Sequence, residues 1–193
     1  MKFTETWLAG AYLIDIEPRE DERGFFARTF CRREFEDHGL EPNLLQCSVS
    51  FNRCQGTIRG IHFQRSPYQE TKIVRCTAGA IFDVIVDLRA DSPTFLKYLA
   101  VELTAENRRA LYVPKDFAHG FQTLAEETEV AYQMSEFYAP NSAAGLRWND
   151  PLLAIEWPLP VSVISQQDAA SADFQGGGDP RLLALQPAPA VQS

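Results

Sequence analysis

Residues 78–89 of the 193-residue chain read AGAIFDVIVDLR. Apolar and mostly β-branched residues fill this segment, Gly79 stands near its start, and the turn-like DSPT at 91–94 follows it. A short apolar run between turn signals is typical of a buried β-strand. This segment therefore predicts a strand in the core of a β-protein.

The flanking sequence repeats the same pattern at short and regular spacing. Further predicted strands are KYLAVEL (97–103), RALYVP (109–114), GFQTL (120–124) and TEVAYQMSEFY (128–138). Helical periodicity is scarce, and we expect one short helix at RREFEDHGL (32–40), ended by Gly39. Many short strands with turns between them favour a mainly β sandwich or barrel with short helices.

The length of the chain is that of a single domain with a sizeable core. We assign residues 1–174 to this domain. Residues 175–193, QGGGDPRLLALQPAPAVQS, combine a glycine run with proline and alanine. That composition predicts a flexible C-terminal tail outside the active site.

Charge and composition disfavour several classes of function. The net charge is −8 and the pI is about 4.9, with no basic cluster, so a nucleic-acid partner is not expected. The chain has no run of 18 apolar residues and no signal-peptide pattern, so we expect neither membrane insertion nor export. The four cysteines lack CxxC spacing and are expected to be reduced thiols in the cytoplasm.

The chain contains three histidines. His38 lies in the charged helical segment and is expected at the surface. His62 in RGIHFQ and His119 in VPKDFAHGF stand beside strand-like residues. Taken alone, each of the two suits a structural histidine better than a catalytic one.

Neighbouring residue types shift that balance toward catalysis. Lys72 begins the apolar stretch KIVRC, and Tyr132 and Tyr138 are expected on one face of one strand. A base, a cation and a phenol are the groups that enolisation beside a ketone needs. Packing in the core or at its rim remains the alternative for the two tyrosines.

Two arginines suit a diphosphate. Arg23 lies in DERGFF, a glycine-containing turn, and Arg59 lies in the RGIHFQ strand. The guanidinium fork matches pairs of phosphate oxygens. The alternative for Arg23 is a surface salt bridge with Asp21 or Glu22.

A metal site is a further alternative. His62, His119 and Glu70 could form a set of two histidines and one carboxylate. Metal-binding double-stranded β-helices usually carry His-x-His, whereas Gln64 stands at the second position here. We therefore predict a reaction without metal.

Several motifs together carry a family resemblance. In chain order they are DERGFF, RGIHFQ, KIVRC, FDVIVDLR with DSPTF, VPKDFAHGF, the Tyr132 to Tyr138 segment, RWNDP and IEWP. This order resembles the dTDP-4-dehydrorhamnose 3,5-epimerase family, the RmlC-like cupins, over about residues 5–168. The resemblance implies a double-stranded β-helix (cupin, jelly-roll barrel), a homodimer, and epimerisation of a nucleotide-linked 4-keto-6-deoxyhexose with no cofactor.

The resemblance also implies roles for individual residues. His62 resembles the base, Lys72 the cation that stabilises the enolate, and Tyr132 the proton donor. Asp168 resembles the aspartate that orients the base, with Asp83 as the second choice. The positions that resemble substrate contacts are Arg23, Gln46, Arg59, His119 and Tyr138, and the DERGFF segment is expected to serve the neighbouring subunit.

The sequence departs from the family pattern at Arg28, at Cys47 to Val49, at Ala143 and at Gln167. These departures leave the nucleotide and the exact sugar open. Two other functions also remain open. One is a single-carbon epimerase or a ketoisomerase on the same scaffold, and the other is a cupin that binds a sugar nucleotide without turnover.

Overall fold

The fold is described by a computed structural model that covers residues 1–174. The predicted tail at 175–193 lies outside the described residues. Two sheets carry most of the chain, and the chain crosses between them repeatedly over residues 72–134. This exchange of strands between two packed antiparallel sheets is the double-stranded β-helix, so the predicted fold class is confirmed.

The first sheet contains six antiparallel strands. In spatial order they are β1 (Lys2–Glu5), β2 (Tyr12–Asp15), β10 (Ala110–Val113), β7 (Lys72–Ala78), β12 (Thr128–Met134) and β5 (Gln46–Asn52). The second sheet follows the order β13 (Ala143–Gly145), β6 (Thr57–Gln64), β11 (Phe117–Thr123), β8 (Ala80–Asp87) and β9 (Tyr98–Thr104). A short strand, β14 (Val163–Ile164), pairs in parallel with β6.

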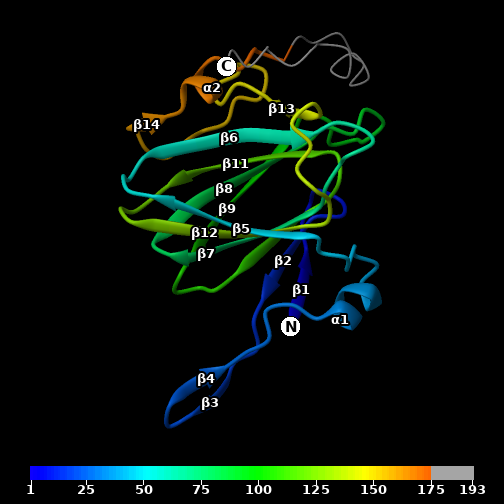
Figure 1. Cartoon of the computed structure of the whole chain (residues 1–193), viewed down its shortest axis with the longest axis vertical. Helices are drawn as coiled ribbons and strands as arrows, with labels where there is room; N and C mark the ends of the chain where they lie inside the picture. Colours follow the sequence, from blue (N-terminus) through cyan, green and yellow to red (C-terminus); the bar gives the residue numbers. More distant parts are fainter. Residues whose placement is uncertain (175–193) are drawn as a thin grey trace.

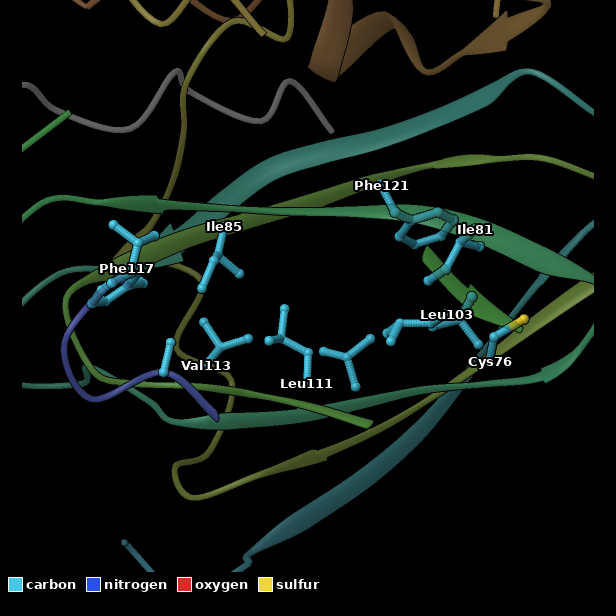
Figure 2. Close-up of a cluster of buried hydrophobic side chains, with 12 residues drawn as sticks. Cys76, Ile81, Ile85, Leu103, Leu111, Val113, Phe117 and Phe121 are labelled. Atoms are coloured by element: carbon cyan, nitrogen blue, oxygen red, sulfur yellow. The ribbon is translucent and has the colours of Figure 1, made fainter. Parts of the chain in front are cut away.

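The main core lies between the two sheets. Figure 2 shows side chains of both sheets pointing toward one another, with Ile81, Ile85 and Phe121 facing Leu111 and Val113. Burial of such side chains is the main favourable contribution to folding. We call the surfaces that bound this space the inner faces of the sheets.

Two short helices accompany the sheets in the described part of the chain. Helix α1 (Arg32–Asp37) follows the prediction, and Gly39 after it has a φ of +68° that glycine adopts readily. Phe35 of α1 is buried against the outer face of the first sheet, where Ile73 and Tyr112 lie. Helix α2 (Gln166–Ala169) lies beside β6. No helix among residues 1–174 is long and apolar enough to cross a membrane.

The N-terminal hairpin differs from the rest of the molecule. Strands β3 (Arg19–Asp21) and β4 (Gly24–Phe26) pair only with each other and extend away from the two sheets (Figure 1). Phe26, the last residue of β4, is 79% exposed. Its neighbour Phe25 is 45% exposed, so two adjacent large apolar side chains face water on the hairpin.

One predicted strand is shorter than expected. The segment 128–138 forms β12 only as far as Met134, so the expectation that Tyr132 and Tyr138 share one face of one strand is wrong. Met134 pairs with Lys72 and Gln46, the first residues of β7 and β5. Both neighbouring strands begin at this level, so the ladder ends there and Tyr138 lies in the loop beyond it.

Candidate active site

A bulge in β6 directs two site residues to the same inner face. His62 lies opposite His119, whereas Arg59 lies opposite Phe121, with a shift of register between the two pairs. Residues three apart in a regular strand point to opposite faces. Because the bulge inserts one extra residue, Arg59 and His62 both face the space between the sheets.

Glycines permit this close pairing. Gly60 has a φ of +103°, and a Cβ there would lie 2.8 Å from Cα of Gly120. A Cβ on Gly120 would lie 2.8 Å from the carbonyl oxygen of Arg59. The glycines of RGIHFQ and VPKDFAHGF are therefore required by the backbone contact that places the two histidines opposite each other.

His62 forms a dyad with Asp168. Its Nε2 lies 2.6 Å from Oδ1 of Asp168, while Oδ2 accepts a hydrogen bond from the backbone N–H of Gly60 at 3.2 Å. The Asp168 carboxyl group is buried, which raises its pKa, but its hydrogen bonds with His62, Gly60 and Ser165 outweigh this and hold the pKa below its usual value. A carboxylate in this position accepts the Nε2 proton, so Nδ1 of His62 carries the lone pair.

Asp83, the second choice as partner of His62, contacts the other histidine. Its Oδ1 lies 2.7 Å from Nε2 of His119, and both side chains are buried. Burial raises the pKa of Asp83, an effect that His119 and the charge of Lys72 partly offset. The site therefore contains two dyads: the His62 side chain of the first is 51% exposed, whereas both side chains of the second are buried.

Tyr132 reaches this region from the opposite sheet. Its ring stands edge-on to the ring of His119, with 5.9 Å between centroids. Burial, followed by the negative charge of Asp83, raises the pKa of Tyr132 above its usual value, and Arg59 opposes this. The phenol consequently keeps its proton at neutral pH and is a hydrogen-bond and proton donor.

Lys72 begins β7 and points to the same inner face. Its Nζ lies 2.8 Å from Oε1 of Glu70, and the two side chains are only 11% and 12% exposed. The sequence offered Glu70 as a possible metal ligand, and its pairing with Lys72 was not predicted. The spacing of two residues at the start of a strand carries no signal for such a pair.

Arg59 and Gln46, two of the predicted substrate-binding residues, are each held by a hydrogen bond. Nε of Arg59 donates to Oδ1 of Asn52 at 2.6 Å, and Oε1 of Gln46 accepts from the backbone N–H of Tyr138 at 2.7 Å. Gln46 and Asn52 lie on the same inner face of β5, so Asn52 is a further site residue that sequence reasoning missed. Period-two alternation from Gln46 could have found it.

The structure does not bring Arg23 to the other site residues. Arg23 lies on the extended hairpin with a 90% exposed side chain, and its Nη2 contacts Oδ2 of Asp21 at 2.6 Å. Arg23 thus forms the surface salt bridge with Asp21 that the sequence offered as the alternative.

The metal-site alternative finds no arrangement to support it. Within residues 1–174, no group of three or more His, Cys, Asp or Glu side chains is placed to hold a metal ion. His62, His119 and Glu70 each have another partner, namely Asp168, Asp83 and Lys72. The three side chains that were considered as metal ligands are thus engaged with three separate partners.

The residues brought to the inner faces are complementary in chemistry. The second sheet supplies an imidazole with a free Nδ1, and the first supplies a protonated phenol and an ammonium group. A base and an acid on opposite sides of one space, with a cation beside them, can move a carbon-bound proton from one face of a ring to the other.

Comparison with known proteins identifies the family. Residues 5–176 match the family model described as dTDP-4-dehydrorhamnose 3,5-epimerase. A protein of that name from Methanothermobacter thermautotrophicus is 42% identical over 170 residues, which are 86% of this chain and 91% of the relative.

Solved structures agree with this match. The Bacillus anthracis dTDP-4-dehydrorhamnose 3,5-epimerase with TDP and PPi bound is 42% identical, with a TM-score of 0.87 over 90% of this chain and 99% of that one. The Legionella pneumophila dTDP-6-deoxy-D-glucose-3,5-epimerase in complex with dTDP-4-keto-L-rhamnose is 37% identical, with a TM-score of 0.83 over 88% and 90%. The chain belongs to the dTDP-4-dehydrorhamnose 3,5-epimerase family.

Proposed function

We propose that this enzyme epimerises a dTDP-linked 4-keto-6-deoxyhexose at carbons 3 and 5. The observation that carries the proposal is the placement of His62, held by Asp168, on one sheet and of Tyr132 on the other. The relatives supply the substrate class, since one was solved with TDP and another with dTDP-4-keto-L-rhamnose.

The proposed reaction proceeds by enolisation. Nδ1 of His62 takes the proton from the carbon next to the ketone, and the electron pair of that C–H bond forms a C=C bond as the C4 oxygen becomes an enolate. The Lys72 ammonium group donates a hydrogen bond to this oxygen. The enolate then collapses, and the carbon takes a proton from the Tyr132 hydroxyl on the other face, which inverts the centre.

The other predicted residues are assigned to substrate binding. Arg59 lies on the inner face beside the dyad and is proposed to hold the diphosphate, with Arg23 as a second cation. Gln46 and His119 would contact the nucleotide sugar, and Tyr138, held beside Gln46, would stack on a ring. Among the departures from the family pattern, Arg28 pairs with Glu34 at 2.9 Å, and Val49 is 62% exposed on β5.

We further propose that the enzyme is a homodimer and that the hairpin of one chain completes the site of the other. Val49 and Phe51 on edge strand β5, together with Phe25 and Phe26 on the hairpin, form exposed apolar surface that a second copy would cover. Sedimentation velocity at micromolar concentration should show a dimer, and a lone monomer would contradict the proposal.

A cytoplasmic location is proposed because all four cysteines are free thiols and two of them are exposed. Cell fractionation that recovered the protein outside the cytoplasm would contradict it.

The reaction itself is tested by hydrogen exchange. The enzyme is incubated in heavy water with dTDP-4-keto-L-rhamnose, and deuterium is located by NMR. We expect deuterium at carbons 3 and 5, with inversion at both. Exchange at one carbon would indicate a single-carbon epimerase, and binding without exchange would indicate a binding protein; either result contradicts the proposal.

A further inference from the structure

Two largely buried side chains next to Lys72 have no part in the proposed reaction. Glu70 pairs with Lys72 at 2.8 Å, and Gln64 is 5% exposed beside it. We infer that Glu70 is a positioning residue that holds the Lys72 ammonium group where the enolate oxygen forms, and that Gln64 fixes Glu70. The inference rests on the proposed function, because it assigns Lys72 to the enolate.

The position of Glu70 is determined by more than one contact. Its Oε2 accepts a hydrogen bond from Nε2 of Gln64 at 3.1 Å, while Oε1 faces Lys72. The same Nε2 also lies 3.0 and 3.2 Å from the carbonyl oxygens of Tyr68 and Phe137, so its two N–H groups are shared among three acceptors. With both oxygens engaged, the carboxylate has little freedom to turn away from Lys72.

Gln64 extends this network to the loop that carries Tyr138. Its Oε1 accepts a hydrogen bond from the backbone N–H of Ala139 at 2.6 Å, and its Nε2 reaches the carbonyl oxygen of Phe137. One amide side chain therefore connects both neighbours of Tyr138 to the partner of Lys72. The network joins a residue proposed to stack on substrate to the cation proposed to stabilise the enolate.

An ammonium group in this position needs a carboxylate partner. Lysine has a long side chain with about 2 kcal/mol of rotamer entropy, and a buried unpaired ammonium is costly. Lys72 also interacts electrostatically with Asp83, whose Oδ2 has no hydrogen-bond partner among the described residues. Without Glu70, Lys72 can turn toward Asp83, which would draw its ammonium group away from the position proposed for the enolate oxygen.

Glu70 leaves Lys72 free to act. The ammonium group has three N–H donors, and the contact with Oε1 uses one of them. The remaining donors can reach a substrate oxygen while the ion pair persists. The pair therefore supports the proposed role of Lys72, and it does not block it.

The test uses Glu70→Gln, which keeps the size of the side chain and removes its charge, and Glu70→Asp, which keeps the charge. Asp15→Asn is the matched control, because it breaks the 2.8 Å ion pair that joins the last residue of β2 to Arg109, the residue before β10. For Glu70→Gln we expect kcat to fall by about 10- to 100-fold, since a displacement of about 1 Å at a reacting group costs about that much. KM should change less than about threefold, Glu70→Asp should recover part of kcat, and Asp15→Asn should leave it unchanged.

A second measurement does not depend on catalysis. Acetylation of Lys72 by acetic anhydride is followed by mass spectrometry, with the exposed Lys97 and Lys115 as internal standards. The ion pair holds the 11% exposed Lys72 amine in place, so its loss should raise the relative rate at Lys72 severalfold, while Asp15→Asn should not. An unchanged rate at Lys72, or an unchanged kcat in an active enzyme, would overturn the inference. If the wild-type protein shows no epimerisation, the proposed function is refuted. A difference in the acetylation rate of Lys72 between Glu70→Gln and that wild-type protein would still support the contact between Glu70 and Lys72.

Discussion

Replacement of His62 by alanine is expected to lower the rates of epimerisation and of hydrogen exchange by about 10²- to 10⁴-fold, the usual contribution of a general base. The physical reason is that Nδ1 of His62 is the nitrogen left free by the contact between Nε2 and Asp168. Without it, nothing removes the carbon-bound proton. The dissociation constant of thymidine diphosphate should stay within about tenfold, because the loss falls on the transition state.

His38→Ala is the matched control for this variant. His38 is exposed beside Phe3 and takes no part in the site, so its removal should leave both rates unchanged. Rates are read by NMR in heavy water and binding by calorimetry. Exchange near the wild-type rate in His62→Ala would show that another residue is the base. A large loss of binding would show that the histidine acts mainly by holding substrate.

Replacement of Tyr132 by phenylalanine should separate exchange from inversion. The phenol supplies the proton on the face opposite His62, and its raised pKa keeps that proton in place until the enolate forms. Without the hydroxyl, epimerisation should fall by about 10²- to 10⁴-fold. Deuterium should still enter the substrate with retained configuration, because His62 can return a proton to the face from which it took one.

Tyr98→Phe on β9 controls for the loss of a tyrosine hydroxyl elsewhere, since the Tyr98 hydroxyl contacts the backbone of Glu156 outside the site. It should leave exchange and inversion unchanged. Inversion at the wild-type rate in Tyr132→Phe would assign the donor to another group. An equal loss of exchange and inversion would place the role of Tyr132 before proton abstraction.

Local sequence patterns were sufficient to predict the strands from β8 to β12, but not those before residue 57. The apolar run at 78–89 contains β8, the segments at 97–103 and 109–114 match β9 and β10 closely, and α1 falls within 32–40. These predictions depend on side-chain periodicity and turn residues, which act between neighbours in the chain. The ends of strands depend on their partners, which is why β12 stops at Met134 although the sequence reads on as a strand.

The residue types of the site were likewise visible in the sequence, and the family motifs singled out His62, Lys72 and Tyr132. Their arrangement was not. Arg59 and His62 share a face only because a bulge interrupts β6, and no alternation pattern predicts where a ladder will slip. Arg23, placed by its motif among the phosphate-binding residues, lies on a hairpin that a single chain holds apart from the site.

The sequence by itself determined which chemical groups were available and that they would lie in a two-sheet β-protein, because those properties follow from composition and short-range pattern. Only the tertiary structure decided which groups are partners. Asp168 lies 106 residues from His62 in the chain, yet it is Asp168 that contacts His62, whereas Asp83 contacts His119. Which aspartate contacts which histidine depends on how the sheets pair and on where helix α2 lies beside β6. Contacts between residues so far apart in the sequence are set by the packing of the whole domain.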